Sequence, residues 1–377
     1  MFYKNAKIYG ADFRFHLGAF EVKDDGTFGV ILPDSVPADA VNLNGAAVIP
    51  GLVDVHNHGN SGADFSDGDY EGLLKMARYL AKEGVTSFAP ASMTLPYEVL
   101  ENAFATAKKL HNDRPADCAR LMGIQMEGPY FSEKKKGAQN GAYLKNPDFE
   151  GFKKLYDGCD GLVRIVDIAP ELPGSREFVE RASKLCTVSV AHTDSDYDHA
   201  QQAFSAGATH LTHLFNAMPA INHRNPGVIP AAVENKNVRA ELICDGMHIH
   251  PAVVRMAFSM FGAGRMVIVS DALRCCGMPD GEYELGGQQV FLKGGIARLA
   301  DGTIAGSATN LFECMRRAIS FGIPQEDAIR AASYNPACAL NAQHEIGSIE
   351  CGKKADFVVC NADYSEKTVY IGGIQIH

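Results

Sequence analysis

The chain has 377 residues, of which 46% are hydrophobic and 21% are charged. These values are typical of a globular protein with a sizeable core and exclude a disordered chain. The formal net charge of -10 argues against a general nucleic-acid-binding surface, which needs clustered Lys and Arg. A few local cations would still be enough to bind one phosphate group.

The cysteines and the N-terminus indicate a cellular compartment. Ten cysteines are scattered along the chain without a CxxC pair. The segment Met1–Asn5 lacks the long apolar core of a secretion signal, and no apolar run is long enough to span a bilayer. We therefore expect reduced thiols in the cytoplasm and neither a membrane nor a nucleic acid as partner.

The two ends of the chain carry short β patterns. Phe2–Tyr9 and Ala19–Leu32 are rich in Val, Ile, Phe and Tyr between Gly, Asp and Pro, and Asp356–Cys360 and Thr368–Ile371 are similar. Two β-rich ends around a long middle predict one small β-sandwich domain, formed by residues 1–47 plus 347–377.

Residues 48–346 alternate between apolar runs and helical patterns, starting within the run Ala47–Val55. The helical patterns include Tyr70–Lys82, Pro96–Leu110, Arg176–Leu185, Asp196–Ala206 and Ala252–Phe261. The predicted strands are Ala47–Val55, Val85–Ala89, Arg120–Met126, Leu162–Ala169, Thr187–Ala191, His210–His213, Arg239–Cys244 and Met266–Ser270. This alternation predicts an α/β fold, a (β/α)8 TIM-type barrel. A doubly wound open sheet is the alternative, but its Gly-rich fingerprint is not evident after the first strand.

One segment departs from the alternation. Glu282–Ala300 is typical of a β hairpin or small β insertion after the eighth strand, and Asn310–Phe321 then returns to a helical pattern.

Potential metal ligands follow the predicted strands. His56 and His58 are two residues apart at the end of an apolar run, so their imidazoles can face one way. Alone, such a pair is a weak signal, and an acid after a strand is usually a turn residue or helix cap. Here six candidate side chains end five strands: His56, His58, Glu127, His192, His213 and Asp271. That set predicts a metal site at the carboxyl ends of the strands.

The candidate roles differ among these residues. A Glu/His/His set with one open position is typical of a catalytic metal site. Asp271 is the candidate general base, although it could also be a ligand. Asn216 and His248 are candidate substrate contacts, and Arg224 is a candidate phosphate clamp because Arg binds phosphate bidentately.

Several motifs together resemble a known family. Pro50–Gly59 and Gly347–Asp356 resemble segments common across the amidohydrolase superfamily. The motifs Met126–Pro129, Ala191–Thr193, Thr212–Met218, Asp245–His248 and Ser270–Ala272 are similar to those of the N-acetylglucosamine-6-phosphate deacetylase family. The resemblance covers essentially the whole chain.

The resemblance implies hydrolysis of N-acetylglucosamine 6-phosphate to glucosamine 6-phosphate and acetate in amino-sugar catabolism. It implies one or two divalent metals per subunit, zinc or iron, with Glu127, His192 and His213 holding the main ion. His56 and His58 are available for a second ion, with Glu127 bridging. It also implies a homodimer in which Arg224 serves the neighbouring site. The implied substrate contacts are Ala138, Asn216, Ala217, Arg224, His248, Ile304, Ala305 and Gly306. Gln139 stands where the family often has His.

Three alternatives remain open at this stage. One is a deacetylase for the galactosamine epimer, since loops read the orientation of a single hydroxyl. Another is a different amidohydrolase, such as a cyclic amidase or deaminase, although many cyclic amidases use a carbamylated Lys where this chain has Glu127. The last is a non-catalytic relative, which the retention of every ligand and the base disfavours.

Overall fold

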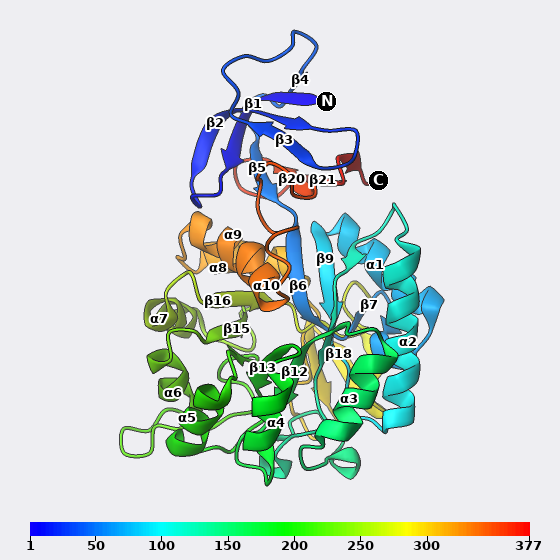
Figure 1. The fold of residues 1–377 in the computed structure, drawn as a ribbon, viewed down its shortest axis with the longest axis vertical. Helices are drawn as coiled ribbons and strands as arrows, with labels where there is room; N and C mark the ends of the chain where they lie inside the picture. Colours follow the sequence, from blue (N-terminus) through cyan, green and yellow to red (C-terminus); the bar gives the residue numbers. More distant parts are fainter.

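Parallel strands alternate with helices through most of the chain in the computed structural model, which describes residues 1–377 (Figure 1). The strands are β6 (Leu52–Asn57), β9 (Val85–Pro90), β11 (Ile124–Met126), β12 (Val163–Ile168), β13 (Thr187–Val190), β14 (His210–Leu211), β15 (Arg239–Ile243) and β16 (Met266–Val269). The helices between them are α1 (Tyr70–Lys82), α2 (Tyr97–Asp113), α3 (Phe149–Gly158), α4 (Ser175–Ala182), α5 (Tyr197–Ala206), α6 (Val228–Glu234) and α7 (Pro251–Phe261). The predicted α/β class with parallel strands is confirmed.

The parallel strands form two sheets that meet at both edges. One sheet has the order β10-β9-β6, with β10 at Arg120–Leu121, and the other runs from β11 to β16 in chain order. Isolated parallel bridges join Ala91 to Gln125 and Asn57 to Ala272. Because all these pairs are parallel, the carboxyl ends of the strands lie at one end of the sheets.

Successive side chains of β16 are buried in two different apolar clusters. Met266 and Ile268 belong to the large cluster of 75 buried residues that includes the helices, whereas Val267 and Val269 belong to a separate cluster of 12. A period of two is what a strand covered on both faces requires. Both faces of β16 are therefore covered by apolar side chains.

Helix α1 shows why the sequence folds as predicted there. Asp69 caps it by accepting from the Gly72 N–H, and the buried residues recur at helical spacing: Leu73, Leu74, Met76, Ala77, Leu80 and Ala81. The predicted range Tyr70–Lys82 is confirmed at both ends.

Both ends of the chain enter one further sheet, at the upper end of the molecule in Figure 1. Strand β20 pairs antiparallel with β5, which pairs with β1, so the C-terminal segment is joined to the N-terminal one. The rings of Tyr3 and Phe20 stack at 4.9 Å and pack with Phe357. The strands are β1 (Phe2–Tyr9), β2 (Phe15–Val22), β3 (Phe28–Ile31), β4 (Val41–Asn42), β5 (Ala47–Pro50), β20 (Phe357–Cys360), β21 (Lys367–Ile371) and β22 (Ile374–Gln375).

Two predicted strands are wrong in their continuity. Ala47–Val55 divides into β5 of the terminal sheet and β6 of the parallel sheet, separated at Gly51. A Cβ at Gly51 would lie 2.1 Å from Thr86 Oγ1, so only glycine fits this crossing point. Arg120–Met126 also divides, into β10 and β11. The short strands expected within Ala19–Leu32 are the end of β2 and β3.

The predicted β insertion is confirmed after β16. It consists of β17 (Gly281–Leu285), β18 (Gln288–Lys293) and β19 (Ile296–Leu299), paired antiparallel in chain order. A smaller hairpin joins β7 (Gly59–Asn60) and β8 (Ala63–Asp64), and α8 (Leu311–Ser320), α9 (Gln325–Ala332) and α10 (Tyr334–Ala339) follow the insertion. None of the helices has the length and apolar character needed to cross a membrane.

Candidate active site

Six buried polar side chains meet at the carboxyl ends of the parallel strands. His56 lies in β6 and His58 just after it, Glu127 directly follows β11, and His192, His213 and Asp271 each stand two residues beyond a strand. All six have exposed fractions of 7% or less. The structure therefore brings together every residue that the sequence predicts for the metal site and the base.

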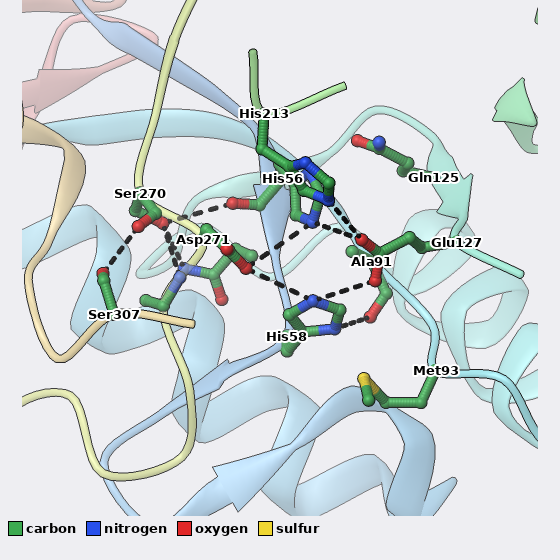
Figure 2. A network of polar contacts seen from close by, with 12 residues as sticks. His56, His58, Ala91, Met93, Gln125, Glu127, His213, Ser270, Asp271 and Ser307 are labelled. Carbon is green, nitrogen blue, oxygen red and sulfur yellow. Dashed lines mark hydrogen bonds and ion pairs between the residues drawn. The ribbon is translucent and has the colours of Figure 1, made fainter. Parts of the chain in front are cut away.

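The histidines form two donor sets that share Glu127. One set is His56, His58 and Glu127, the other is Glu127, His192 and His213, and within each set the donor atoms lie within 4.8 Å of one another. The Nε2 atoms of His192 and His213 are each 3.2 Å from Glu127 Oε1. His58 Nε2 is 3.3 Å from Glu127 Oε2 and lies between Glu127 and Asp271 in Figure 2.

Hydrogen bonds at Nδ1 turn three of the four imidazoles toward Glu127, whereas His213 Nδ1 has no partner. His58 Nδ1 contacts the Ala91 carbonyl at 3.1 Å, and His192 Nδ1 contacts the Lys135 carbonyl at 2.9 Å. His56 Nδ1 contacts Glu241 Oε2 at 2.9 Å. Such outer contacts fix the tautomer and leave Nε2 free for a metal.

The unpaired nitrogen atoms fit a divalent cation. His56 Nε2 is buried without a hydrogen-bond partner, and the Nε2 atoms of His192 and His213 face each other at 3.1 Å. Buried polar atoms are normally satisfied, so this arrangement requires an explanation. A cation with nitrogen and oxygen ligands provides one.

Charge couples the carboxylates to the histidines. Burial favours the neutral form of Glu127, but His56, His58 and the hydrogen bonds from His192 and His213 hold its pKa well below the ordinary value. Burial opposes protonation of His58, yet Glu127 and Asp271 raise its pKa to about 10. Burial likewise favours neutral Asp271, but His56 and His58 lower its pKa. Both carboxylates are therefore ionised and available to cations.

The backbone is strained at three of these positions. The φ angles are 42° at His192, 30° at His213 and 48° at Asp271. Non-glycine residues rarely adopt this left-handed region, and such strain gathers at functional sites. At Asp271 the conformation is fixed by hydrogen bonds from its N–H to the His56 carbonyl and from the Ser307 N–H to its own carbonyl.

A cavity of about 210 Å³ opens beside these side chains. Of the predicted substrate contacts, six line it: Ala138, Asn216, Ala217, His248, Ile304 and Gly306. Ala305 does not, because it is fully buried in the apolar cluster of the β insertion. Arg224 does not either: it is exposed in the loop between β14 and α6.

The sequence analysis missed the contacts that Glu241 and Gln139 make in the site. Glu241 is fully buried in β15 and bonds His56 and His210 at 2.9 and 3.0 Å. An acidic residue inside the apolar run Arg239–Cys244 was the available signal. Gln139, which stands where the resembling family often has His, lines the cavity, and its Nε2 donates to Glu127 Oε2 at 2.6 Å.

Comparison with known proteins decides the family. The amidohydrolase family profile matches residues 47–375, which is most of the chain. The chain belongs to the amidohydrolase family.

Several members of the amidohydrolase family are similar over nearly the full length. N-acetylglucosamine-6-phosphate deacetylase from Vibrio furnissii is 36% identical over 338 residues, covering 89% of this chain and 84% of that protein. N-acetylgalactosamine-6-phosphate deacetylase from Escherichia coli O157:H7 is 31% identical over 352 residues, covering 93% and 92%. A solved structure of N-acetyl-D-glucosamine-6-phosphate deacetylase from Mycobacterium smegmatis, a mutant in complex with N-acetyl-D-glucosamine-6-phosphate, has a TM-score of 0.94 at 30% identity and covers 100% and 99%.

Proposed function

We propose that this chain is a metal-dependent hydrolase of a linear amide that converts N-acetylglucosamine 6-phosphate into glucosamine 6-phosphate and acetate. The observation that carries the proposal is the pair of donor sets sharing Glu127 beside a cavity that Asp271 also lines. The similarity to deacetylases of this substrate supports it along the whole chain.

The fold proposal is a (β/α)8 TIM-type barrel with a small β-sandwich domain. The eight parallel strands, with bridges at both sheet edges, support closure of the barrel. We assign residues 1–47 plus 347–377 to the small domain and 48–346 to the hydrolase domain, with β5 lying across that boundary. Active sites of such barrels lie at the carboxyl ends of the strands, where the six polar residues meet.

The proposed cofactor is one or two divalent metals per subunit, zinc or iron. Glu127, His192 and His213 would hold the main ion, and His56 and His58, with Glu127, would hold a second. When bound, such an ion supplies Lewis acidity, which lowers the pKa of water and polarises a carbonyl oxygen. Nitrogen and carboxylate ligands suit both metals.

Asp271 is the proposed general base and then general acid. Its Oδ1 lies 3.4 Å from His58 Nε2 and 3.6 Å from His56 Nε2, so it is directed at the donor sets. Its lowered pKa keeps it ionised and able to accept a proton from water. The same proton can then pass to the departing nitrogen, which leaves as the amine of the sugar.

The cavity residues are the proposed substrate contacts. Asn216, Ala217 and His248 would bind the sugar phosphate together with Ala138, and Ile304, Ala305 and Gly306 would form the acetyl pocket, with Ala305 supporting it from behind. A Cβ at Gly306 would lie 2.8 Å from the Asp271 carbonyl oxygen, so this segment packs directly against the base. In the proposed homodimer, the exposed Arg224 binds the phosphate in the partner's cavity.

The cytoplasm is the proposed compartment, supported by ten cysteines that are all free thiols. A second candidate substrate is the galactosamine epimer, because the Escherichia coli relative carries that name.

Acetate release tests the function. Purified protein would be given N-acetylglucosamine 6-phosphate, its galactosamine epimer or unphosphorylated N-acetylglucosamine, before and after chelation. We expect fast, chelator-sensitive release from the glucosamine compound alone. Faster release from the epimer would support the second candidate, and no release from any of the three with metal restored would reject both.

A further inference from the structure

Gln139 is the neutral side chain in closest contact with the shared carboxylate. It is buried, with an exposed fraction of 4%, in the loop that follows Glu127. Its Nε2 lies 2.6 Å from Glu127 Oε2, and its Oε1 accepts from the Thr94 N–H at 2.8 Å. Gln139 therefore ties the metal carboxylate to the backbone beyond β9.

The two contacts define the orientation of the amide. The Thr94 N–H can only donate, so the group facing it must be the amide oxygen. The nitrogen must then face Glu127, and an ionised carboxylate can only accept. Both ends of the amide agree, which removes the usual ambiguity between its oxygen and nitrogen.

The loop that carries Gln139 is also held independently. Gln288 Nε2, on β18 of the insertion, donates to the Ala138 carbonyl at 2.5 Å. Gln288 thus restrains the same loop one residue earlier without touching Glu127. A substitution at Gln288 is therefore a control for effects that arise only from loosening this loop.

We propose that Gln139 is a positioning residue for the metal centre: it fixes the Glu127 carboxylate in the orientation that both donor sets share. The inference rests on the proposed metal site but goes beyond the substrate and the reaction. A neutral donor suits this position, because it restrains one oxygen without adding a positive charge that would repel the cations. The oxygen Oε1 remains directed at His192, His213 and His56, and Oε2 keeps a lone pair for His58.

The test measures metal affinity rather than activity. Gln139→Met keeps the size of the side chain but removes the donor, and Gln288→Met makes the same change at the control position. Zinc dissociation constants would be measured by competition with a chromogenic chelator, and zinc content by atomic emission. We expect affinity about tenfold to 100-fold weaker in Gln139→Met, as for other outer contacts of metal ligands, and unchanged affinity in Gln288→Met.

Two further readouts separate positioning from other roles. Gln139→Leu also removes the donor at a similar volume, so it should also weaken zinc binding; this variant serves if Gln139→Met does not fold. A substrate contact would instead raise KM with unchanged zinc affinity. That result, or an equal loss of affinity in Gln288→Met, would overturn the proposal.

The outcome for Gln139 is distinguishable from the outcome for the reaction. The zinc measurement uses no substrate. If Gln139→Met weakens zinc binding but the wild-type protein releases no acetate, only the proposed reaction is rejected. A wild-type protein that binds no zinc, iron or other divalent metal would overturn both proposals.

Discussion

Asp271 is the residue whose role is most sharply defined by its surroundings. Its side chain faces the Nε2 atoms of His56 and His58, and its backbone adopts a strained, positive φ. Strain at a buried acid persists only when the surrounding structure enforces it. A group held this way is suited to transferring a proton at one fixed place.

Asp271→Asn should separate proton transfer from metal binding. The amide has the shape of the carboxylate but cannot accept a proton from water, so we expect turnover to fall by a factor on the order of 10² or more. Metal content should be retained, because Glu127, His192 and His213 are unchanged. Steady-state kinetics and atomic emission on the same sample check both points. Near-normal turnover would remove Asp271 from the mechanism.

His248 carries a pH-dependent charge at the cavity. Burial disfavours its cation, but Asp245, whose Oδ2 lies 2.8 Å from His248 Nδ1, raises its pKa above the ordinary 6.5. The cation is therefore fully present at low pH and is lost as pH rises through the raised pKa. Because the proposed substrate is an anion, its KM should increase over that interval.

Asp245→Asn should move this pH dependence. Without the Asp245 charge the pKa of His248 falls, so we expect the rise in KM to begin at a lower pH. Measuring KM between about pH 6 and 9 in both proteins checks this shift. The increase in KM should be on the order of tenfold, because one charged contact is lost. Superimposable KM profiles would show that His248 does not bind the anionic group.

Among the elements, β6 and the residue that follows it supply both histidines of one donor set, which Glu127 completes. His56 lies in the strand and His58 immediately beyond it, so one short segment determines whether the second set exists. The Glu241 side chain on β15 and the Ala91 carbonyl after β9 hold the two rings from either side. The set therefore depends on β6, on Glu127 after β11, and on contacts from β9 and β15.

His56→Ala combined with His58→Ala should lower the metal stoichiometry. If both donor sets are filled, we expect a decrease from two ions to one per chain, since the other set keeps all three ligands. Metal analysis after gel filtration in metal-free buffer measures it, with thermal unfolding as a control for folding. Unchanged metal content in the double variant would indicate a single-metal enzyme.

Some features of the fold and the site could be predicted from the sequence, and others could not. The ends of apolar runs are visible in the sequence, so Glu127, His192 and His213 could be predicted as ligands. The division of Ala47–Val55 could not, because β5 and β6 are both fully buried and form one apolar run. Contacts between distant segments were equally hidden: Glu241 and His56 are 185 residues apart in the chain.

In the whole molecule, Arg224 is a predicted substrate contact that does not line the cavity of its own chain. Its side chain is exposed, outside the cavity, and its backbone N–H and that of Asn225 donate to Asn222 Oδ1 at 2.9 and 3.2 Å. The loop therefore has a defined shape that presents Arg224 outward. In a symmetric dimer an outward residue can complete the partner's site, and the reverse contact follows by symmetry.

Mixing two impaired variants tests that arrangement. Arg224→Ala should weaken binding of the phosphorylated substrate by about tenfold or more, since Arg contacts to phosphate are charge-assisted, and should have little effect on the unphosphorylated sugar. Asp271→Asn lacks the base but keeps Arg224. After the two proteins are dissociated and reassembled together, half of the dimers should be mixed, and each mixed dimer should contain one complete site. Activity below KM should therefore recover to about a quarter of the wild-type value.

The control distinguishes the two possible locations of Arg224. If Arg224 served its own subunit, every site in the mixture would lack either Arg224 or Asp271, and activity would equal the average of the two variants assayed separately. Recovery above that average requires a residue shared between subunits. Sedimentation measurements on the same mixture would establish that dimers have formed, so that an absence of recovery in assembled dimers counts against the shared site.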